Sequence, residues 1–419
     1  MATLAAAGLL IVLRMDIGLA YLVLSIPFFL FPRIIFGKAF SMVETLTLLC
    51  FAAWLRQQAL DSAWHEPRQR ARAWLRSLNA LDWAVIAFVL LAALSLFVSS
   101  NRGVSIREFR VIIIEPALLY FLLRQTKLTE KQLLRLADAL LLAGVAVSAI
   151  GLYQYFGHGD VIVTEGVRRI HSVYASPNNL SLLLGRVIPL AIAMVVAGRS
   201  ARRQVYGTAL VPLILCLFLT YSRGGWLLAL PAALLTIGLL RGRRTASIAA
   251  LSVLICLLLL LPLLGTQRLV SLFDLEEGTT FRRLRLWQAS VAMLRDHPLS
   301  GVGLDNFLYQ YPNYMLNDAW QEPGLSHPHN LVLDWWLRLG IGGVVILAWL
   351  MVSFFRLALR LYRRLPDGDV RAIILGWMAG MAAVLAHGMI DNSYFLVDLA
   401  FIFCLTLGWV RAMQKGLNG

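Results

Sequence analysis

The sequence predicts an all-α polytopic membrane protein with about 12 transmembrane helices and one large external helical loop. Three observations support this fold class. The 419 residues are 59% hydrophobic and only 15% charged, which is more apolar surface than a water-soluble core can bury. Apolar segments of about 17–25 residues recur along almost the whole chain, the length a helix needs to cross roughly 30 Å of hydrocarbon. These segments lack the strict alternation of apolar and polar residues that is typical of transmembrane β-barrel strands.

The charged residues set the expected topology. The net charge is +15, and most Lys and Arg residues sit in short blocks between apolar segments. In a soluble protein such a charge would suggest nucleic acid as a partner, but these blocks mark cytoplasmic loops and contacts with anionic lipid headgroups. An N-terminus on the inside, starting an uncleaved first span, puts every basic block on the cytoplasmic face. The four cysteines lie within apolar spans without C-x-x-C spacing, so neither disulfides nor thiolate metal sites are expected.

The apolar runs between the basic blocks give the order of elements. Spans are expected at about residues 17–31, 39–55, 83–97, 111–123, a run ending near 156, a run beginning after 179, 209–221, 226–240, a run ending near 264, 331–355, 373–390 and 396–410. A basic, tryptophan-containing segment after the second span predicts an interfacial helix. The chain then divides into residues 1–265 with helices 1–9 and their cytoplasmic basic loops, 266–328 as a large periplasmic loop subdomain, and 329–419 with helices 10–12.

Two arginines next to or inside these spans are candidate site residues. The seventh and eighth spans are joined only by Ser222-Arg223-Gly224-Gly225. So tight a turn holds Arg223 near the interface, and its glycines would let the backbone approach a ligand; the alternative role for Arg223 is an interfacial anchor. Arg186 lies in the first turns of the sixth span, where an ionisable residue is costly and therefore a site candidate. A structural ion pair is the competing explanation for Arg186.

The large loop contains a predicted amphipathic helix that starts near Thr279 or Thr280 and ends before Pro298. Its expected apolar face is Leu284, Trp287, Val291 and Leu294. The first turn carries the arginines Arg282, Arg283 and Arg285, which oppose the helix macrodipole. Such an arrangement is explained if an anion such as a phosphate binds there. The alternative is that these arginines reach out to lipid headgroups.

The stretch from Leu325 to Gly343 contains the candidate base. Its polar edge, Ser326 to Asn330, runs directly into an apolar segment, and a neutral His329 there can accept a proton near neutral pH. His327 lies two residues away, but no third ligand with suitable spacing is evident, so no metal site is expected. The segment Asp391 to Tyr394 either orients an imidazole or a sugar, or is a polar loop.

Four motifs occur in one order: the turn Ser222 to Gly225, the R-L-x-L-W run at Arg283 to Trp287, the turn Pro298 to Phe307, and H-N-x9-G-x-x-G at His329 to Gly343. Together they resemble the shared domain of O-antigen ligases and O-antigen polymerases, over about residues 221–343. The N-terminal half resembles this family only in hydropathy and in the number of spans.

The resemblance implies a fold similar to that of lipid-linked-sugar glycosyltransferases of the GT-C type. It also implies a multi-pass protein of the bacterial inner membrane with its active site on the periplasmic side and no metal or other cofactor. The donor would be an O-antigen glycan on undecaprenyl diphosphate, and a ligase would transfer it to a sugar of lipid A-core. His329 would be the general base, and Arg223 and Arg283 would bind the diphosphate, with Arg282 and Arg186 as further binders.

Three alternatives to the ligase remain open at this stage. An O-antigen polymerase shares the domain, and nothing in the sequence identifies the acceptor. An oligosaccharyltransferase acting on protein serine is less compatible, because members of that group often carry additional C-terminal sequence. A lipid-linked oligosaccharide flippase is the alternative from a different class, and it would require charges along a central path in two similar halves.

Overall fold

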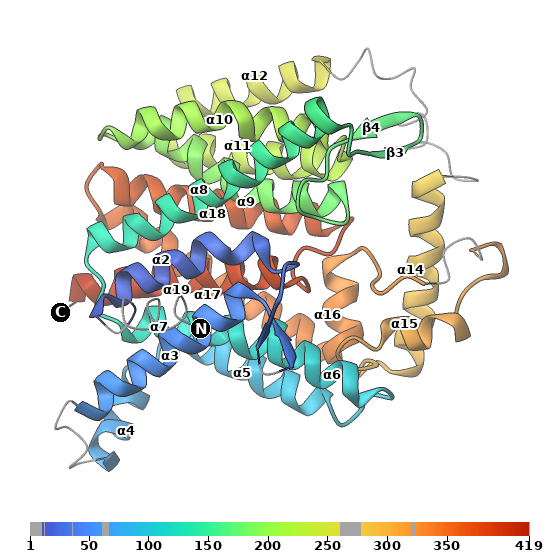
Figure 1. Ribbon diagram of the computed structural model, residues 1–419, viewed down its shortest axis with the longest axis horizontal. Coiled ribbons are helices and arrows are strands. Elements are labelled where there is room, and N and C mark those ends of the chain that lie inside the picture. The colour runs from blue at the N-terminus through green and yellow to red at the C-terminus, as the bar shows by residue number, and fades with distance from the viewer. Residues whose placement is uncertain are drawn as a thin grey trace.

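The computed structural model is mostly helical and describes residues 11, 13–35, 37–60, 67–259, 278–319 and 324–418. Long helices lie side by side and make up a bundle (Figure 1). The expected end of the ninth span near residue 264 and the boundary between residues 265 and 266 lie outside the described residues.

The first half of the bundle contains two short hairpins and three short segments of 3₁₀ or π helix next to its α-helices. Its elements are α2 (Met15–Ser25), η1 (Ile26–Phe28), β1 (Arg33–Ile35), β2 (Lys38–Phe40), α3 (Met42–Leu60), α4 (Pro67–Arg76), α5 (Ala80–Ser95), α6 (Arg102–Glu108), the π-helical η3 (Phe109–Ile114), α7 (Glu115–Gln125), α8 (Glu130–Tyr153), the π-helical η4 (Gln154–His158), β3 (Ile162–Thr164), β4 (Val167–Arg169) and α9 (Pro177–Ala197). β1 pairs with β2 and β3 with β4, both antiparallel.

The second half contains the short helices of the large loop. Its elements are α10 (Arg202–Leu219), the π-helical η5 (Gly225–Ala229), α11 (Leu230–Arg241), α12 (Arg243–Leu259), α14 (Gly278–Asp296), α15 (Phe307–Gln310), η7 (Tyr311–Asn313), η8 (Asn317–Ala319), α16 (Leu331–Leu339), α17 (Ile341–Arg364), α18 (Asp369–Gly388) and α19 (Val397–Asn418).

Several helices are of membrane-spanning length, as the fold class requires. In the described part of the chain, six are long and apolar enough to cross a membrane: Glu130–His158, Pro177–Ala197, Arg202–Leu219, Ile341–Arg364, Asp369–Gly388 and Val397–Gly416. Shorter apolar helices cover Met15–Phe28, Ala80–Ser95 and Gly225–Arg241. The chain is therefore a multi-pass membrane protein, and the count of twelve spans stays a prediction.

The centre of the bundle is formed by α9, α18 and α19, whose side chains are mostly buried. Gly376 of α18 faces α9, and a Cβ atom there would lie 2.8 Å from the Cα atom of Leu190. A small residue at this point lets the two helix backbones approach closely, as is common in membrane bundles.

The connections predicted for the outer face gather at one end of the bundle. Both hairpins, α14 and α16 lie toward the end opposite α4 and the C-terminus (Figure 1). This arrangement agrees with the expectation that the Arg223 turn, the large loop and His329 share one face.

The expected tenth span at 331–355 is wrong as a single helix. It is two helices, α16 and α17, which meet at Gly340 with φ 69° and ψ −173°, a conformation that essentially only glycine adopts. The spanning helix is α17, while α16 runs beside α14 at the end of the bundle (Figure 1). The break was not predicted, because apolar residues lie on both sides of Gly340.

The helix in the large loop is present, but its inward face differs from the predicted one. Leu284 and Val291 are 37% and 41% exposed, whereas the buried side chains of α14 are Leu286, Ala289, Ser290, Met293 and Leu294. The helix starts at Gly278, close to the predicted start, and the hydroxyl of Thr279 in its first turn accepts a hydrogen bond from Arg223. The helix ends at Asp296, before Pro298, as predicted.

The turn from Pro298 to Phe307 packs against α16 and holds it in place. The carbonyl oxygen of Leu337 accepts a hydrogen bond from the Val302 N–H at 2.6 Å, and a Cβ atom on Gly301, which has φ 64°, would lie 2.3 Å from that oxygen. A Cβ atom on Gly340 would lie 1.8 Å from the carbonyl oxygen of Leu299. Two of the motifs behind the family resemblance therefore pack against each other, which sets the position of α16.

We expect Gly340→Ala to destabilise the protein by at least ~1–3 kcal/mol, because alanine must adopt a disfavoured conformation and its Cβ atom collides with the turn. Gly342→Ala is the matched control, since its nearest neighbour is the flexible side chain of Leu91 at 3.1 Å. Thermal unfolding in detergent measures both. Equal melting temperatures for the two variants would contradict this account of the break.

Candidate active site

Arg223 is held by the short connection between α10 and η5. Tyr221, with φ 48°, turns the chain, and the Trp226 indole N–H donates to the Leu217 carbonyl oxygen at 3.1 Å. Arg223 is buried, and its guanidinium donates to the hydroxyl of Thr279 in the first turn of α14. The tight turn therefore connects the membrane bundle to the helix of the large loop.

The two glycines of this turn make room for protein side chains. A Cβ atom on Gly224 would lie 2.3 Å from the imidazole of His387 in α18, and one on Gly225 would lie 2.2 Å from the hydroxyl of Ser181 in α9. The missing side chains let α18 and α9 approach closely, and this brings His387 to the base of the turn. Gly224 also lines the cavity described below, and the approach of a ligand to this backbone stays a prediction.

These elements enclose a cavity of about 90 Å³, here called the arginine cavity. Its lining comes from β3, β4, α9, the Arg223 turn, α14 and the end of α18. The lining residues are Thr164, Arg169, Asn178, Ser222, Arg223, Gly224, Thr279, Arg283, His387, Ile390 and Asp391. Two of the predicted diphosphate binders, Arg223 and Arg283, therefore line one cavity although they are far apart in the sequence.

The arginines of α14 occupy different surroundings. Arg283 lines the arginine cavity, whereas Arg285 forms an ion pair with Asp318 at 2.7 Å and lies over the ring of Phe281. Arg282 is half-buried and is not among the lining residues. This arrangement favours Arg283 as the arginine of the loop that faces an anion.

Arg186 lies outside the arginine cavity. It is buried, and its guanidinium donates to the carbonyl oxygens of Leu182 and Ser393. It lines a separate narrow void with Trp377. These contacts support a positioning role, because Ser393 is two residues from Asp391 of the cavity.

His329 is hydrogen-bonded to Asp391. Its Nδ1 lies 2.9 Å from Asp391 Oδ1, and a quarter of the His329 side chain is exposed. When Nδ1 carries the proton for this bond, Nε2 on the opposite edge of the ring keeps a free electron pair and is the basic atom. Of the two alternatives for the Asp391 segment, the geometry supports the one in which it orients an imidazole.

The charge on Asp391 is favoured by its neighbours. Burial raises the pKa of this carboxyl, but the hydrogen bond from His329, the electrostatic interactions with the imidazoles of His329 and His387, and the charge of Arg283 outweigh burial, so the pKa lies below its usual value. Because Asp391 both lines the arginine cavity and bonds His329, it joins the base to the cationic site.

The backbone at His329 is fixed from both sides. His329 has φ 49°, its N–H donates to His327 Nδ1 at 3.3 Å, and the indole N–H of Trp287 donates to the Pro328 carbonyl oxygen at 3.0 Å. After it, Asn330 caps the start of α16. Its side-chain oxygen accepts hydrogen bonds from the N–H groups of Val332 and Leu333, and its side-chain amide donates to the Met389 carbonyl oxygen at 2.9 Å.

Within the described ranges, no three His, Cys, Asp or Glu side chains are grouped so as to hold a metal ion.

Sequence reasoning missed two charged or titratable residues of the cavity. Arg169 of β4 donates to the Thr220 carbonyl oxygen at 2.7 Å and to Asn178 at 2.8 Å. His387 is 2% exposed, and its Nδ1 has no hydrogen-bond partner among the described residues. A polar residue inside a span was the signal available for His387, since the same criterion singled out Arg186.

Comparison with known proteins places the central motifs in a family. Residues 208–348 match the family model described as O-antigen ligase. Over this segment the chain is similar to O-antigen ligases, and the resemblance drawn from its motifs is confirmed. The match does not separate ligases from polymerases.

Other comparisons add little. No curated protein matches the chain. A chain from a solved structure titled "Structural coordination of polymerization and crosslinking by a peptidoglycan synthase complex" is 18% identical, with 80% of this chain and 96% of that chain covered and a TM-score of 0.46. A likeness at that score carries no argument about this protein.

The imidazole of His327 makes stability depend on pH. Burial, together with the charges of His329 and Arg338, lowers the pKa of His327 from 6.5 to about 3. Between these two pH values the unfolded chain binds the proton and the folded chain does not, so stability falls as the pH is lowered through this window. We expect His327→Asn to show a shallower loss of melting temperature from pH 7 to pH 4 than the wild type.

His297→Asn, which alters an exposed histidine, is the control for this prediction. It should follow the wild-type pH profile. Parallel profiles for the wild type and His327→Asn would rule out a neutral His327 in the folded protein.

Proposed function

We propose that the protein is an O-antigen ligase that transfers an undecaprenyl-diphosphate-linked O-antigen glycan to a sugar hydroxyl of lipid A-core. The observation that carries the proposal is the arginine cavity, in which Arg223 and Arg283 lie with Asp391, the partner of His329. The family match supports the glycosyltransferase class, and the multi-pass fold supports a lipid-linked donor.

The arginine cavity suits the diphosphate of the donor. Guanidinium groups bind phosphate oxygens through paired N–H donors and remain charged in a partly buried site. With Arg169 they surround a small space that also contains one carboxylate. Fixed positive charge at this place would stabilise the negative charge that develops on the departing diphosphate.

The proposed chemical step is a single displacement at the anomeric carbon, with inversion. His329 Nε2 takes the proton of the acceptor hydroxyl, and the hydroxyl oxygen forms a bond to the anomeric carbon. The bond from that carbon to the diphosphate oxygen breaks, and the electron pair leaves with undecaprenyl diphosphate. Asp391 holds the Nδ1 proton of His329 and stabilises the imidazolium that forms.

The location of the active site is part of the same proposal. We place the active site on the periplasmic side of the bacterial inner membrane, where such donors are used. The gathering of the hairpins, α14 and α16 at one end of the bundle supports this orientation (Figure 1). The flippase alternative requires charges along a central path, whereas Arg223, Arg283 and Asp391 line one cavity and Asp391 is bonded to His329.

A polymerase of the same family is distinguished by its products. The banding pattern of lipopolysaccharide is compared between a strain that lacks this gene and the same strain complemented with the wild type. If the protein is a ligase, the deletion leaves bare lipid A-core and long glycans remain on the carrier lipid. Core bearing a single repeat would instead identify a polymerase.

We expect His329→Ala to lower transfer at least ~100-fold, the contribution of a positioned general base, while the protein still reaches the membrane. Asp391→Asn should lower transfer in the same direction, because the amide does not stabilise the imidazolium. Transfer is measured in vitro with purified protein, lipid-linked glycan and lipid A-core. Full activity of His329→Ala would remove the base assignment.

The arginines of α14 offer a matched pair. Arg283→Ala should abolish transfer because it removes a cavity guanidinium, whereas Arg285→Ala, which loses contacts with Asp318, Gln288 and Phe281 outside the cavity, should stay within a few-fold of the wild type. Arg283→Lys should restore little activity if paired N–H contacts are needed. Equal losses in Arg283→Ala and Arg285→Ala would contradict the assignment of the diphosphate site.

A further inference from the structure

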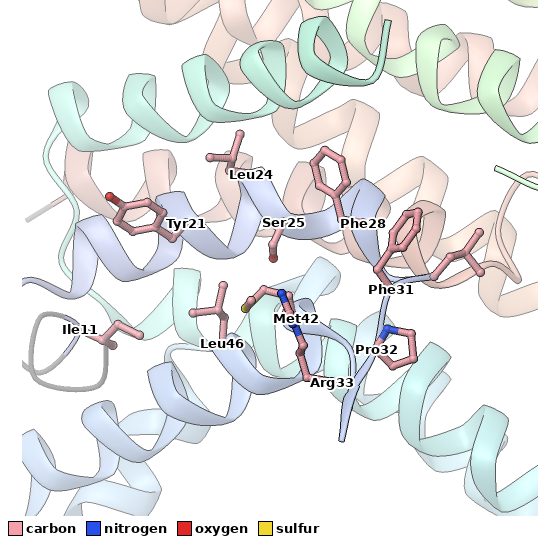
Figure 2. A pocket seen from close by; sticks show the side chains of 11 residues that line it. Ile11, Tyr21, Leu24, Ser25, Phe28, Phe31, Pro32, Arg33, Met42 and Leu46 are labelled. Carbon is pink, nitrogen blue, oxygen red and sulfur yellow. The ribbon is translucent and has the colours of Figure 1, made fainter. Parts of the chain in front are cut away.

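A larger cavity, the α2–α3 groove, lies between the first two described helices and the hairpin that joins them (Figure 2). Its volume is about 1090 Å³, at the upper end of the ~300–1,000 Å³ typical of ligand pockets. Its lining residues are Ile11, Tyr21, Leu24, Ser25, Phe28, Leu30, Phe31, Pro32, Arg33, Met42 and Leu46.

The walls of the groove are apolar, and its one charged lining residue is a cation. Among the described lining residues Arg33, on β1 beside Pro32 and near Met42, is the only charged group (Figure 2). Ser25 is occupied within its own helix, since its hydroxyl donates to the Leu22 carbonyl oxygen at 2.8 Å. The groove therefore suits a molecule with long apolar chains and an anionic group at one end.

The rim of the groove indicates a lipid. Tyr21, Phe31 and Met42 are 52%, 59% and 38% exposed, and they lie on elements of a membrane bundle. Apolar side chains facing the bilayer are covered by lipid chains, and an arginine at the membrane interface pairs with a lipid phosphate.

The groove is separate from the arginine cavity but adjacent to the segment that builds it. The two share no lining residue. Phe29, next to Phe28 of the groove, contacts the ring of Tyr174 at 6.5 Å between centroids. Tyr174 lies in the connection that leads to Asn178, a residue of the arginine cavity in the first turn of α9. A lipid in the groove thus leaves the proposed diphosphate site open.

A transferase that joins two lipid-anchored molecules needs a place for each lipid. We propose that the α2–α3 groove binds acyl chains of the acceptor glycolipid and that Arg33 binds a phosphate of its headgroup. This inference rests on the proposed function, because only there is the second substrate a multiply acylated phosphoglycolipid.

Binding is tested independently of activity by native mass spectrometry of the full chain, offered lipid A and phosphatidylglycerol at equal concentration. The wild type should retain lipid A preferentially. Met42→Trp fills the groove and should lower lipid A binding by about tenfold, the effect of losing one good substrate contact. Leu48→Trp, on the same helix but outside the groove and 45% exposed, is the control and should bind as the wild type does.

The charge of Arg33 is tested by Arg33→Glu beside Arg102→Glu, an exposed arginine at the start of α6 that does not line the groove. Only Arg33→Glu should weaken lipid A binding, and lipid A without phosphates should not distinguish Arg33→Glu from the wild type. Equal retention of phosphatidylglycerol and lipid A, or equal binding by Met42→Trp and Leu48→Trp, would overturn the proposal.

Kinetics separate this inference from the proposed function. With wild-type protein, removing the acyl chains from lipid A-core should raise KM for the acceptor and leave KM for the donor unchanged, and Met42→Trp should remove most of that difference. Equal KM values for acylated and deacylated acceptors would refute the groove while leaving the ligase standing. Failure of the wild type to transfer to either acceptor would refute the ligase instead.

Discussion

The hydrogen bond between His329 Nδ1 and Asp391 Oδ1 joins the two halves of the candidate site. His329 precedes α16, and Asp391 follows α18, so the contact holds together segments 62 residues apart. It requires that α16 begin where it does, since Asn330, which caps the start of the helix, also donates to the carbonyl oxygen of Met389 near Asp391. A loss of register in α16 would therefore separate the imidazole from its carboxylate.

The position of α16 is fixed by charge as well as by shape. Arg338, buried on its last turn, donates to both carboxylate oxygens of Glu108 in α6 and to Asp334 at 2.8 Å, and lies 4.4 Å from the ring centre of Phe395. Removing one partner would leave an uncompensated buried charge, which is strongly destabilising. This network therefore ties the helix behind His329 to both α6 and the segment after Asp391.

The arginine cavity is cationic in a way that suits a diphosphate. Arg169, Arg223 and Arg283 face a space with Asp391 as the acidic group among its described lining residues, and Asp391 is already engaged by His329. Arg169 donates to a carbonyl oxygen and Arg223 to a hydroxyl oxygen, and these hydrogen bonds fix the positions of their guanidinium groups. An anion that enters such a site meets preorganised charge rather than charge that must be rearranged.

The sequence by itself determined the membrane class, the grouping of the outer loops and the family of the central segment. Long apolar runs, basic blocks and ordered motifs are local properties of the chain, and each has one dominant physical explanation. It did not reveal the break at Gly340, because apolar residues lie on both sides of the break. The close contact between Gly340 and the carbonyl oxygen of Leu299 is visible only in the tertiary structure. The sequence also did not reveal Arg169 and His387 as cavity residues, or decide among Arg282, Arg283 and Arg285, because the side of a helix that faces a cavity depends on distant segments. Only the tertiary structure brought Asp391 to His329, since a hydrogen bond between separate helices is set by how those helices pack.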